Sequence, residues 1–122
     1  MDIETALKEA MEIDGALGVS LVDYSSGMSL GSLGGGKYLN LEVASAGNTE
    51  VVRAKMRTLE SLGLKDSIDD ILITLGRQYH LIRLVTGHNG SGLFFYLALD
   101  RSKANLALAR HHLSRIENEL AI

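Results

Sequence analysis

The run Leu93-Phe94-Phe95-Tyr96-Leu97-Ala98-Leu99 decides how the rest of this sequence is interpreted. It follows the loop His88-Asn89-Gly90-Ser91-Gly92, whose Asn-Gly pair suits positive φ angles and therefore a turn. The run is apolar on both faces. A strand of that kind is usually central and covered on both sides, whereas a strand with one wet face alternates. We therefore expect a sheet that has this strand at its centre and helices on both faces.

Four further strands are predicted on the N-terminal side of this run. Alternating or continuous apolar residues between turn signals place them at residues 16–24, 28–33, 71–75 and 79–85. Ser25-Ser26-Gly27 supplies the turn between the first two, and Gly76-Arg77-Gln78 is short enough to pair the other two antiparallel. Gly34-Gly35-Gly36 lets the chain turn freely after the first hairpin, since glycine accepts backbone angles that other residues resist.

Amphipathic helices are predicted at both ends of the chain. Residues 2–13 carry apolar residues at helical spacing, with Asp2 as a possible N-cap and Asp14-Gly15 as a stop. Asp100 is predicted to cap the last helix, because apolar residues recur after it at spacings of three and four. Those residues are Leu106, Ala109, Leu113, Ile116 and Leu120.

A second helix is predicted over residues 39–62, with Gly63 well placed to end it. Glycine inside a helix is unfavourable by about 1 kcal/mol relative to alanine, so Gly47 is a weak point. Asn48 or Thr49 could cap a fresh start, which leaves a kink or break there as an alternative to a continuous helix. Its predicted apolar side is formed by Leu41, Ala44, Val51, Val52, Met56, Leu59 and Leu62.

The resulting order of elements is α-β-β-α-β-β-β-α. It predicts an α/β fold of the α+β kind, a five-stranded antiparallel sheet with helices on both faces. A length of 122 residues suits one ordinary domain. We see no linker, repeat or low-complexity tract, so we expect a single domain over residues 1–122.

Composition excludes several classes of function. The chain is 46% hydrophobic and 22% charged, with a formal net charge of −3, which is the usual globular balance. A nucleic-acid binder is expected to show a basic excess, and none is present. No apolar run reaches the roughly 20 residues needed to span a bilayer, and the N-terminus lacks the pattern of a secretory signal. The sequence also has no cysteine. We expect a cytoplasmic protein with neither nucleic-acid binding nor membrane insertion.

Three segments resemble a known family. They are residues 15–23 with Gly27, residues 71–74 with 79–83, and residues 95–100 with 105–110. They are similar to the opening strand, the third and fourth strands, and the last strand and final helix of the roadblock/LC7 family, including the Asn105-Leu106 opening of that helix. The resemblance covers nearly the whole chain and implies the profilin-like architecture of that family. The motifs that carry it are packing signatures.

The resemblance implies a protein that works by binding other chains. It implies a homodimer or heterodimer joined through the third strands and second helices, with a Ras-like small GTPase or a protein associated with a sensor kinase as partner. The implied dimer residues of this sequence, which we take as a homodimer, are Ile71, Leu72, Ile73, Thr74, Val51, Lys55 and Thr58. Residues 46–55 depart from the alanine-rich second helix common in the family, so partner choice is expected there. Glu50, Arg53 and Arg57 are the candidate partner-binding residues.

We expect no catalytic, cofactor or metal site. In Gly34-Gly35-Gly36-Lys37 the lysine is followed by Tyr38, so the run lacks the Gly-Lys-Ser/Thr ending of a phosphate-binding loop. His111 and His112 point about 100° apart on a helix and do not share a face as metal ligands would. His80 and His88 are given structural roles. The acidic cluster Asp66, Asp69 and Asp70 is interpreted as protection of an exposed strand.

Two other functions stay open at this level. A small-molecule sensor of the PAS or profilin-like type would hold its ligand between the sheet and a helix, in an apolar cavity with convergent polar groups. A GTPase-activating protein would supply a catalytic arginine, for which Arg53, Arg57 and Arg77 are the candidates. The fold alone does not separate these functions from a non-catalytic adaptor.

Overall fold

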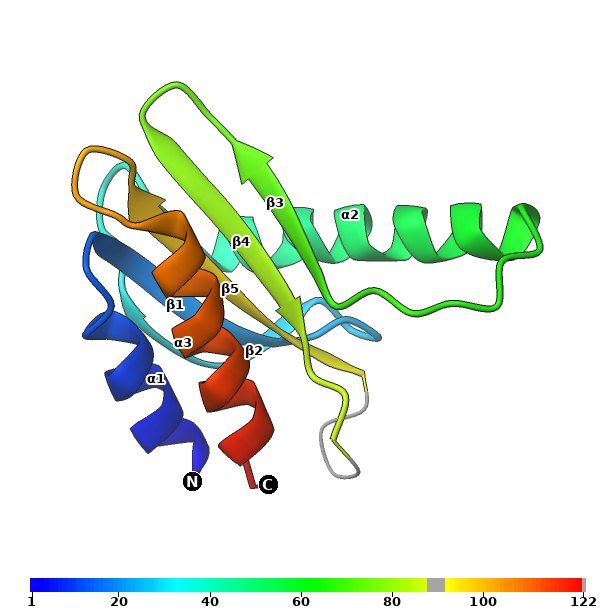
Figure 1. The fold of residues 1–122 in the computed structure, drawn as a ribbon, viewed down its shortest axis with the longest axis horizontal. Coiled ribbons are helices and arrows are strands. Elements are labelled where there is room, and N and C mark those ends of the chain that lie inside the picture. The colour runs from blue at the N-terminus through cyan, green and yellow to red at the C-terminus, as the bar shows by residue number, and fades with distance from the viewer. Residues whose placement is uncertain (88–91, 122) are drawn as a thin grey trace.

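The computed structural model describes residues 1–87 and 92–121, and the predicted turn at Asn89-Gly90 lies outside them, as does His88. Its elements follow the predicted order α-β-β-α-β-β-β-α (Figure 1). They are α1 (Ile3–Met11), β1 (Ala16–Asp23), β2 (Met28–Gly34), α2 (Leu41–Ser61), β3 (Asp70–Thr74), β4 (Gln78–Leu84), β5 (Leu93–Asp100) and α3 (Leu106–Glu119).

The sheet has the strand order β2-β1-β5-β4-β3, and every neighbouring pair is antiparallel. β5 is the central strand, and its residues Leu93–Leu99 are all buried, which confirms the prediction made from its two apolar faces. β2 and β3 are the two edge strands.

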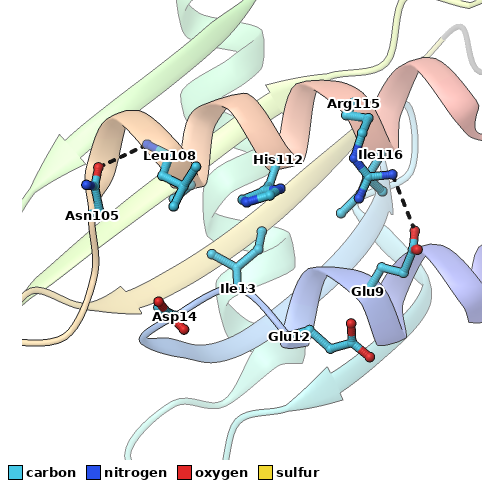
Figure 2. A pocket seen from close by; sticks show the side chains of 10 residues that line it. Glu9, Glu12, Ile13, Asp14, Asn105, Leu108, His112, Arg115 and Ile116 are labelled. Atoms are coloured by element: carbon cyan, nitrogen blue, oxygen red, sulfur yellow. Dashed lines mark hydrogen bonds and ion pairs between the residues drawn. The ribbon is translucent and has the colours of Figure 1, made fainter.

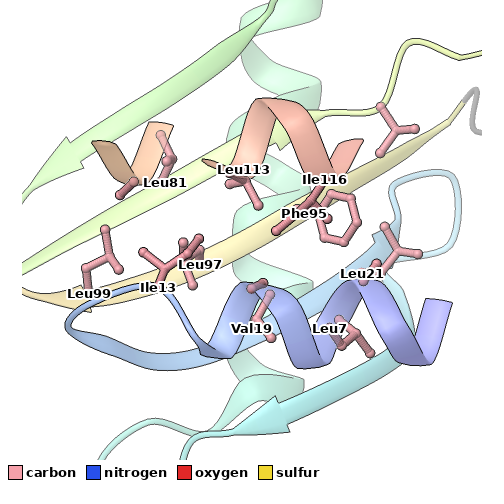
Figure 3. Packing of buried hydrophobic residues seen from close by; sticks show 14 of the residues in the cluster. Leu7, Ile13, Val19, Leu21, Leu81, Phe95, Leu97, Leu99, Leu113 and Ile116 are labelled. Carbon is pink, nitrogen blue, oxygen red and sulfur yellow. The ribbon is translucent and has the colours of Figure 1, made fainter. Parts of the chain in front are cut away.

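Two hydrophobic clusters lie on opposite faces of the sheet. α1 and α3 cover one face, which we call the α1–α3 face, and α2 lies across the other, the α2 face (Figure 1). β5 contributes Phe95 and Leu97 to the first cluster and Phe94 and Tyr96 to the second. Figure 3 shows Leu113 and Ile116 of α3 packed with Phe95 on the α1–α3 face. The two-sided sheet predicted from the sequence is therefore confirmed.

α2 is one continuous helix of 21 residues, so Gly47 does not break it. Asn40 caps its first turn by accepting hydrogen bonds from the backbone N–H groups of Glu42 and Val43, and Gly63 follows its end at a φ of +69°. Thr49 does not start a new helix, because its hydroxyl donates to the Ser45 carbonyl one turn earlier at 2.8 Å.

The predicted apolar side of α2 is wrong in part. The buried residues of this helix are Ser45, Thr49 and Val52. Leu62 is 64% exposed and Val51 is 36% exposed, although both lie on the predicted apolar side. The C-terminal half of the helix extends beyond the strands in Figure 1, so its outer residues have no sheet to pack against.

The predicted cap of the last helix is also wrong. Asp100 accepts hydrogen bonds from the backbone N–H and the hydroxyl of Ser102, which forms a local turn after β5. The N-cap of α3 is Asn105, whose side-chain oxygen accepts from the Leu108 N–H at 3.0 Å. Both residue types cap helices well, and the chain places the turn before the helix.

Candidate functional site

The edge strand β3 carries the first group of predicted interface residues. Ile71 and Ile73 pack against the cluster on the α2 face, while Thr74 is exposed. Leu75 donates its N–H to the Gln78 carbonyl at 2.9 Å. Hydrogen-bonded and non-hydrogen-bonded pairs alternate along an antiparallel ladder, so the backbone N–H and C=O groups of Leu72 and Thr74 point away from β4. These groups lie on a side of β3 that no other described strand covers.

The outer side of α2 carries the second group. Val51, Lys55 and Thr58 are all exposed, and the Thr58 hydroxyl donates to the Ala54 carbonyl at 2.9 Å. With exposed Leu62 they make the outer side of the helix partly apolar. We call the outer side of α2 together with the free edge of β3 the α2–β3 surface. An apolar helix face and an unpaired strand edge are the two features that favour pairing with another chain.

The predicted partner-binding residues lie in two different environments. The Arg53 guanidinium donates to the Tyr24 carbonyl at 2.8 Å and to the Ser25 carbonyl, and it forms an ion pair with Glu50 at 3.4 Å. Arg53 therefore fastens α2 to the turn between β1 and β2. Arg57 is exposed one turn further along, and the ion pairs of the described residues do not include an Arg57–Glu60 pair.

A groove of about 490 Å³ lies under the C-terminal half of α2. Apolar side chains form most of it, with acidic residues at its rim, and its volume is within the range of about 300–1,000 Å³ common for ligand sites. The lining includes Tyr24, Met56, Leu59, Leu64, Ile68 and Leu84, with Glu60 and Asp66 among the polar residues. This groove is the feature closest to the cavity that a sensor requires.

A smaller groove of about 200 Å³ separates α1 from α3 (Figure 2). Ile13 and His112 point toward each other across it, and Glu9 and Arg115 lie at one end. Arg115 forms its shorter ion pair with Glu119, at 3.1 Å, and stands 3.9 Å from Glu9. The groove is smaller than the common ligand sites, and most of its apolar lining (Ile13, Ala109 and Ile116) belongs to the core.

His80 has a structural place on the α2 face, as its sequence context indicates. Its two ring nitrogens lie 3.2 Å from the Tyr96 hydroxyl and 2.7 Å from the Gln78 side-chain oxygen. Burial lowers the pKa of His80 and raises the pKa of the Tyr96 hydroxyl to about 12. Both side chains are therefore neutral near neutral pH, which suits the buried position of Tyr96 and the half-buried position of His80.

A charged network next to β3 escaped the sequence analysis. Asp70 accepts two hydrogen bonds from Arg110 of α3, at 2.8 and 2.9 Å, and Arg83 of β4 donates to Glu117 of α3 at 3.3 Å. Arg110 and Glu117 are seven residues apart, so their shared helix face was readable from the sequence. The pairing of Asp70 with Arg83 depends on strand register, which the sequence did not define.

The remaining candidates do not converge on a site. The rings of His111 and His112 are 5.9 Å apart at an angle of 59°. Arg77 is exposed in the turn between β3 and β4. Among the residues that the structure describes, no three histidine, aspartate or glutamate side chains gather as metal ligands would. Within residues 1–87 and 92–121, no helix combines the length and the apolar character needed to cross a lipid bilayer.

Comparison with known proteins establishes the fold. No family model and no curated protein matches this sequence. Solved structures that match include a roadblock/LC7 domain from Streptomyces avermitilis, with a TM-score of 0.81 at 10% identity over 97% of this chain and 93% of that one. MglB from Myxococcus xanthus matches with a TM-score of 0.75 at 18% identity, over 94% of this chain and 78% of that one. MglC from the same organism matches with a TM-score of 0.62 at 20% identity, over 98% of this chain and 96% of that one. The chain therefore has the roadblock/LC7 fold.

Proposed function

We propose that residues 1–122 form one domain of the roadblock/LC7 family, a non-catalytic cytoplasmic regulator that works as a homodimer and binds a Ras-like small GTPase or an associated signalling complex. The observation that carries the proposal is the α2–β3 surface, which combines an exposed, partly apolar helix face with a free strand edge. A second copy would pair its β3 with this edge and cover α2 with its own α2. The fold shared with MglB and MglC supports a regulatory role of this kind.

The homodimer is tested by proline at an outward-facing position of the edge. Thr74→Pro removes a backbone N–H that points away from β4, so it should leave the β3–β4 hairpin paired and abolish the dimer. Ser32→Pro is the matched control, because Ser32 faces outward in the same way on the other edge strand, β2. Light scattering should give a dimer mass for the parent and for Ser32→Pro, and a monomer mass for Thr74→Pro. A dimer mass for Thr74→Pro would overturn the proposed interface.

Partner binding is tested at Arg57. Arg53 holds the β1–β2 turn, so a change there would confuse docking with folding, whereas Arg57 is exposed. Rim charges act mainly on encounter and discrimination, so Arg57→Glu should reduce capture of the GTPase in a salt-dependent way and leave the dimer intact. Glu50→Lys reverses the negative charge at the same rim and should also change capture of the GTPase in a salt-dependent way. Arg115→Glu, on the opposite face of the sheet, is the control.

The capture experiment uses the small GTPases of the source organism, loaded with GDP or with a non-hydrolysable GTP analogue. Retention by the parent and by Arg115→Glu, with a clear loss for Arg57→Glu, would support docking on α2. If no GTPase is retained in either state, the partner is of another class. If Arg57→Ala or Arg77→Ala abolishes stimulated GTP hydrolysis while retaining binding, the protein is a GTPase-activating protein instead.

The groove under α2 keeps a small-molecule sensor as the second candidate. Met56→Trp would fill the groove from its α2 side. Under the adaptor proposal this substitution leaves partner capture unchanged. A sensor would lose the stabilisation that its ligand gives to the parent protein, which a thermal-shift measurement with a cell extract fraction detects.

A further inference from the structure

Four charged side chains form a continuous series of ion pairs on the α1–α3 face, beside the edge strand. In order they are Glu117, Arg83, Asp70 and Arg110, with separations of 3.3, 4.0 and 2.8 Å between successive charged groups. The contact at the β3 end is bidentate, since the Nε and a terminal nitrogen of Arg110 reach the two oxygens of Asp70. Two positive and two negative groups alternate, so the series is neutral as a whole.

Burial makes this series different from a surface ion pair. The side chains of Glu117 and Asp70 are 1% and 11% exposed, while that of Arg110 is 49% exposed. A bidentate arginine–carboxylate contact holds its partner in a fixed orientation as well as neutralising it. Arg110 is therefore a solvent-reachable side chain that holds a nearly buried carboxylate in place.

The position of Asp70 connects the series to the free edge. Asp70 is the first residue of β3 and follows residues 62–69, which are all exposed except Ile68. It stands opposite Arg83 in the same alternating ladder as Leu72 and Thr74, so its backbone N–H and C=O also face outward. The Arg110 contact thus fixes the point at which an exposed connector becomes a strand.

The charge of Asp70 is a second reason to expect that Arg110 affects pairing through β3. A charged side chain on an edge strand is a common device against pairing with another chain, and Asp66 and Asp69 already make this end of β3 acidic. Two copies that pair through β3 bring both sets of carboxylates to one interface. Arg110 neutralises the carboxylate that belongs to the strand itself.

We propose that Arg110 is a positioning residue for the pairing of β3 with a second copy, and that it acts through Asp70. The inference rests on the proposed homodimer, and it assigns α3 a part in the strength of an interface that α3 does not itself form. It implies that a change on the outer side of α3 alters dimerisation through this one contact.

The test is a double-mutant cycle on Arg110→Gln and Asp70→Asn, read as the dissociation constant of the dimer by sedimentation equilibrium. Arg110→Gln should raise this constant by up to about fivefold, since a partly exposed charged contact is worth at most about 1 kcal/mol. Asp70→Asn alone should raise it less, because the edge charge disappears with the contact. Adding Asp70→Asn to Arg110→Gln should therefore rescue part of the loss.

Arg115→Gln is the matched control, because Arg115 is 42% exposed on the same helix and pairs with Glu119 rather than with the sheet. Amide exchange of residues 71–74 and thermal unfolding are measured in parallel. A purely structural role would lower thermal stability in the single variants and leave the dissociation constant of the dimer unchanged. If Arg110→Gln raises the dissociation constant no more than Arg115→Gln does, Arg110 has no positioning role. If the parent protein itself is monomeric, the proposed homodimer is wrong, and this result is distinct from a failure of the role proposed for Arg110.

Discussion

Arg53 connects the middle of α2 to the turn between β1 and β2. Its guanidinium donates to the carbonyl groups of Tyr24 and Ser25. We expect Arg53→Ala to lower the free energy of unfolding by about 1 kcal/mol, since the hydrogen bonds involve a charged donor but the side chain is partly exposed. Arg57→Ala, four residues along the same helix, should change it by less than about 0.5 kcal/mol. Equal effects of the two substitutions in urea unfolding would contradict this assignment.

His80 predicts a dependence of stability on acid pH. Because burial lowers its pKa in the folded protein, the unfolded chain binds more protons just below the ordinary value of 6.5. Stability should therefore fall as pH falls through about 6.5 and level off below the lowered pKa. Urea unfolding of the parent and of His80→Gln across this interval measures the effect. The two proteins should differ in slope there, and parallel curves would mean that His80 does not contribute.

Tyr96 predicts the opposite dependence at alkaline pH. Burial raises the pKa of its hydroxyl from 10.0 to about 12, so the folded protein keeps a proton that the unfolded chain releases. Stability should fall as pH rises through this interval. Tyr96→Phe removes the ionisable group, and its unfolding free energy should be flatter over the same range. Absorbance of the tyrosinate ion in the parent provides an independent reading of the transition.

At the scale of the elements, Gly47 offers a way to stabilise α2. A methyl group at this position would meet no atom within 4 Å, and the helix continues through it. Gly47→Ala should therefore stabilise the protein by up to about 1 kcal/mol. Gly34→Ala should do the reverse, because Gly34 has a φ of +75° and its added carbon would lie 2.7 Å from the Leu17 carbonyl oxygen. A shift of the two midpoints in the same direction in urea unfolding would contradict the explanation.

α3 is predicted to be a structural helix. Leu113 is fully buried against β5 and its neighbours (Figure 3). Leu113→Ala should lower the free energy of unfolding by about 2–5 kcal/mol through lost contacts and the cavity that remains. Leu108→Ala on the same helix removes an exposed leucine and should change it by less than about 0.5 kcal/mol. Equal destabilisation by the two would show that the apolar stripe is not what holds α3.

The elements differ in how far their sequences define them. β5 was predictable because seven apolar residues on two faces require cover on both sides. The apolar side of α2 was not, because a 3.6-residue period says which residues share a face and not where the sheet beneath them ends. Val51 and Leu62 have the right type for a core, but the helix carries them to a side without a strand. The cap of α3 was ambiguous for another reason, because Asp100 and Asn105 are both of a residue type that caps helices well.

At the scale of the whole molecule, the candidate site combines predictable and unpredictable parts. β3 was identified as an apolar edge strand, and the structure confirms that it is an edge. The network that reaches it was not predicted, because Asp70, Arg83 and Arg110 lie on three elements. Their meeting depends on the register of β3 against β4 and on the placement of α3. Long-range register is set by the packed core, which a single sequence does not reveal directly.

The strand order has a consequence for the making of the protein on the ribosome. β1 (Ala16–Asp23) pairs with β5 (Leu93–Asp100), so the two halves of the sheet cannot pair until the last strand has been synthesised. At about 5–20 residues per second, the nascent chain spends several seconds with one side of β1 unpaired. Pairings this distant in sequence also slow folding. Chaperones that hold nascent chains therefore have their main opportunity here, and ribosome stalling before β5 should leave a product that aggregates or is degraded.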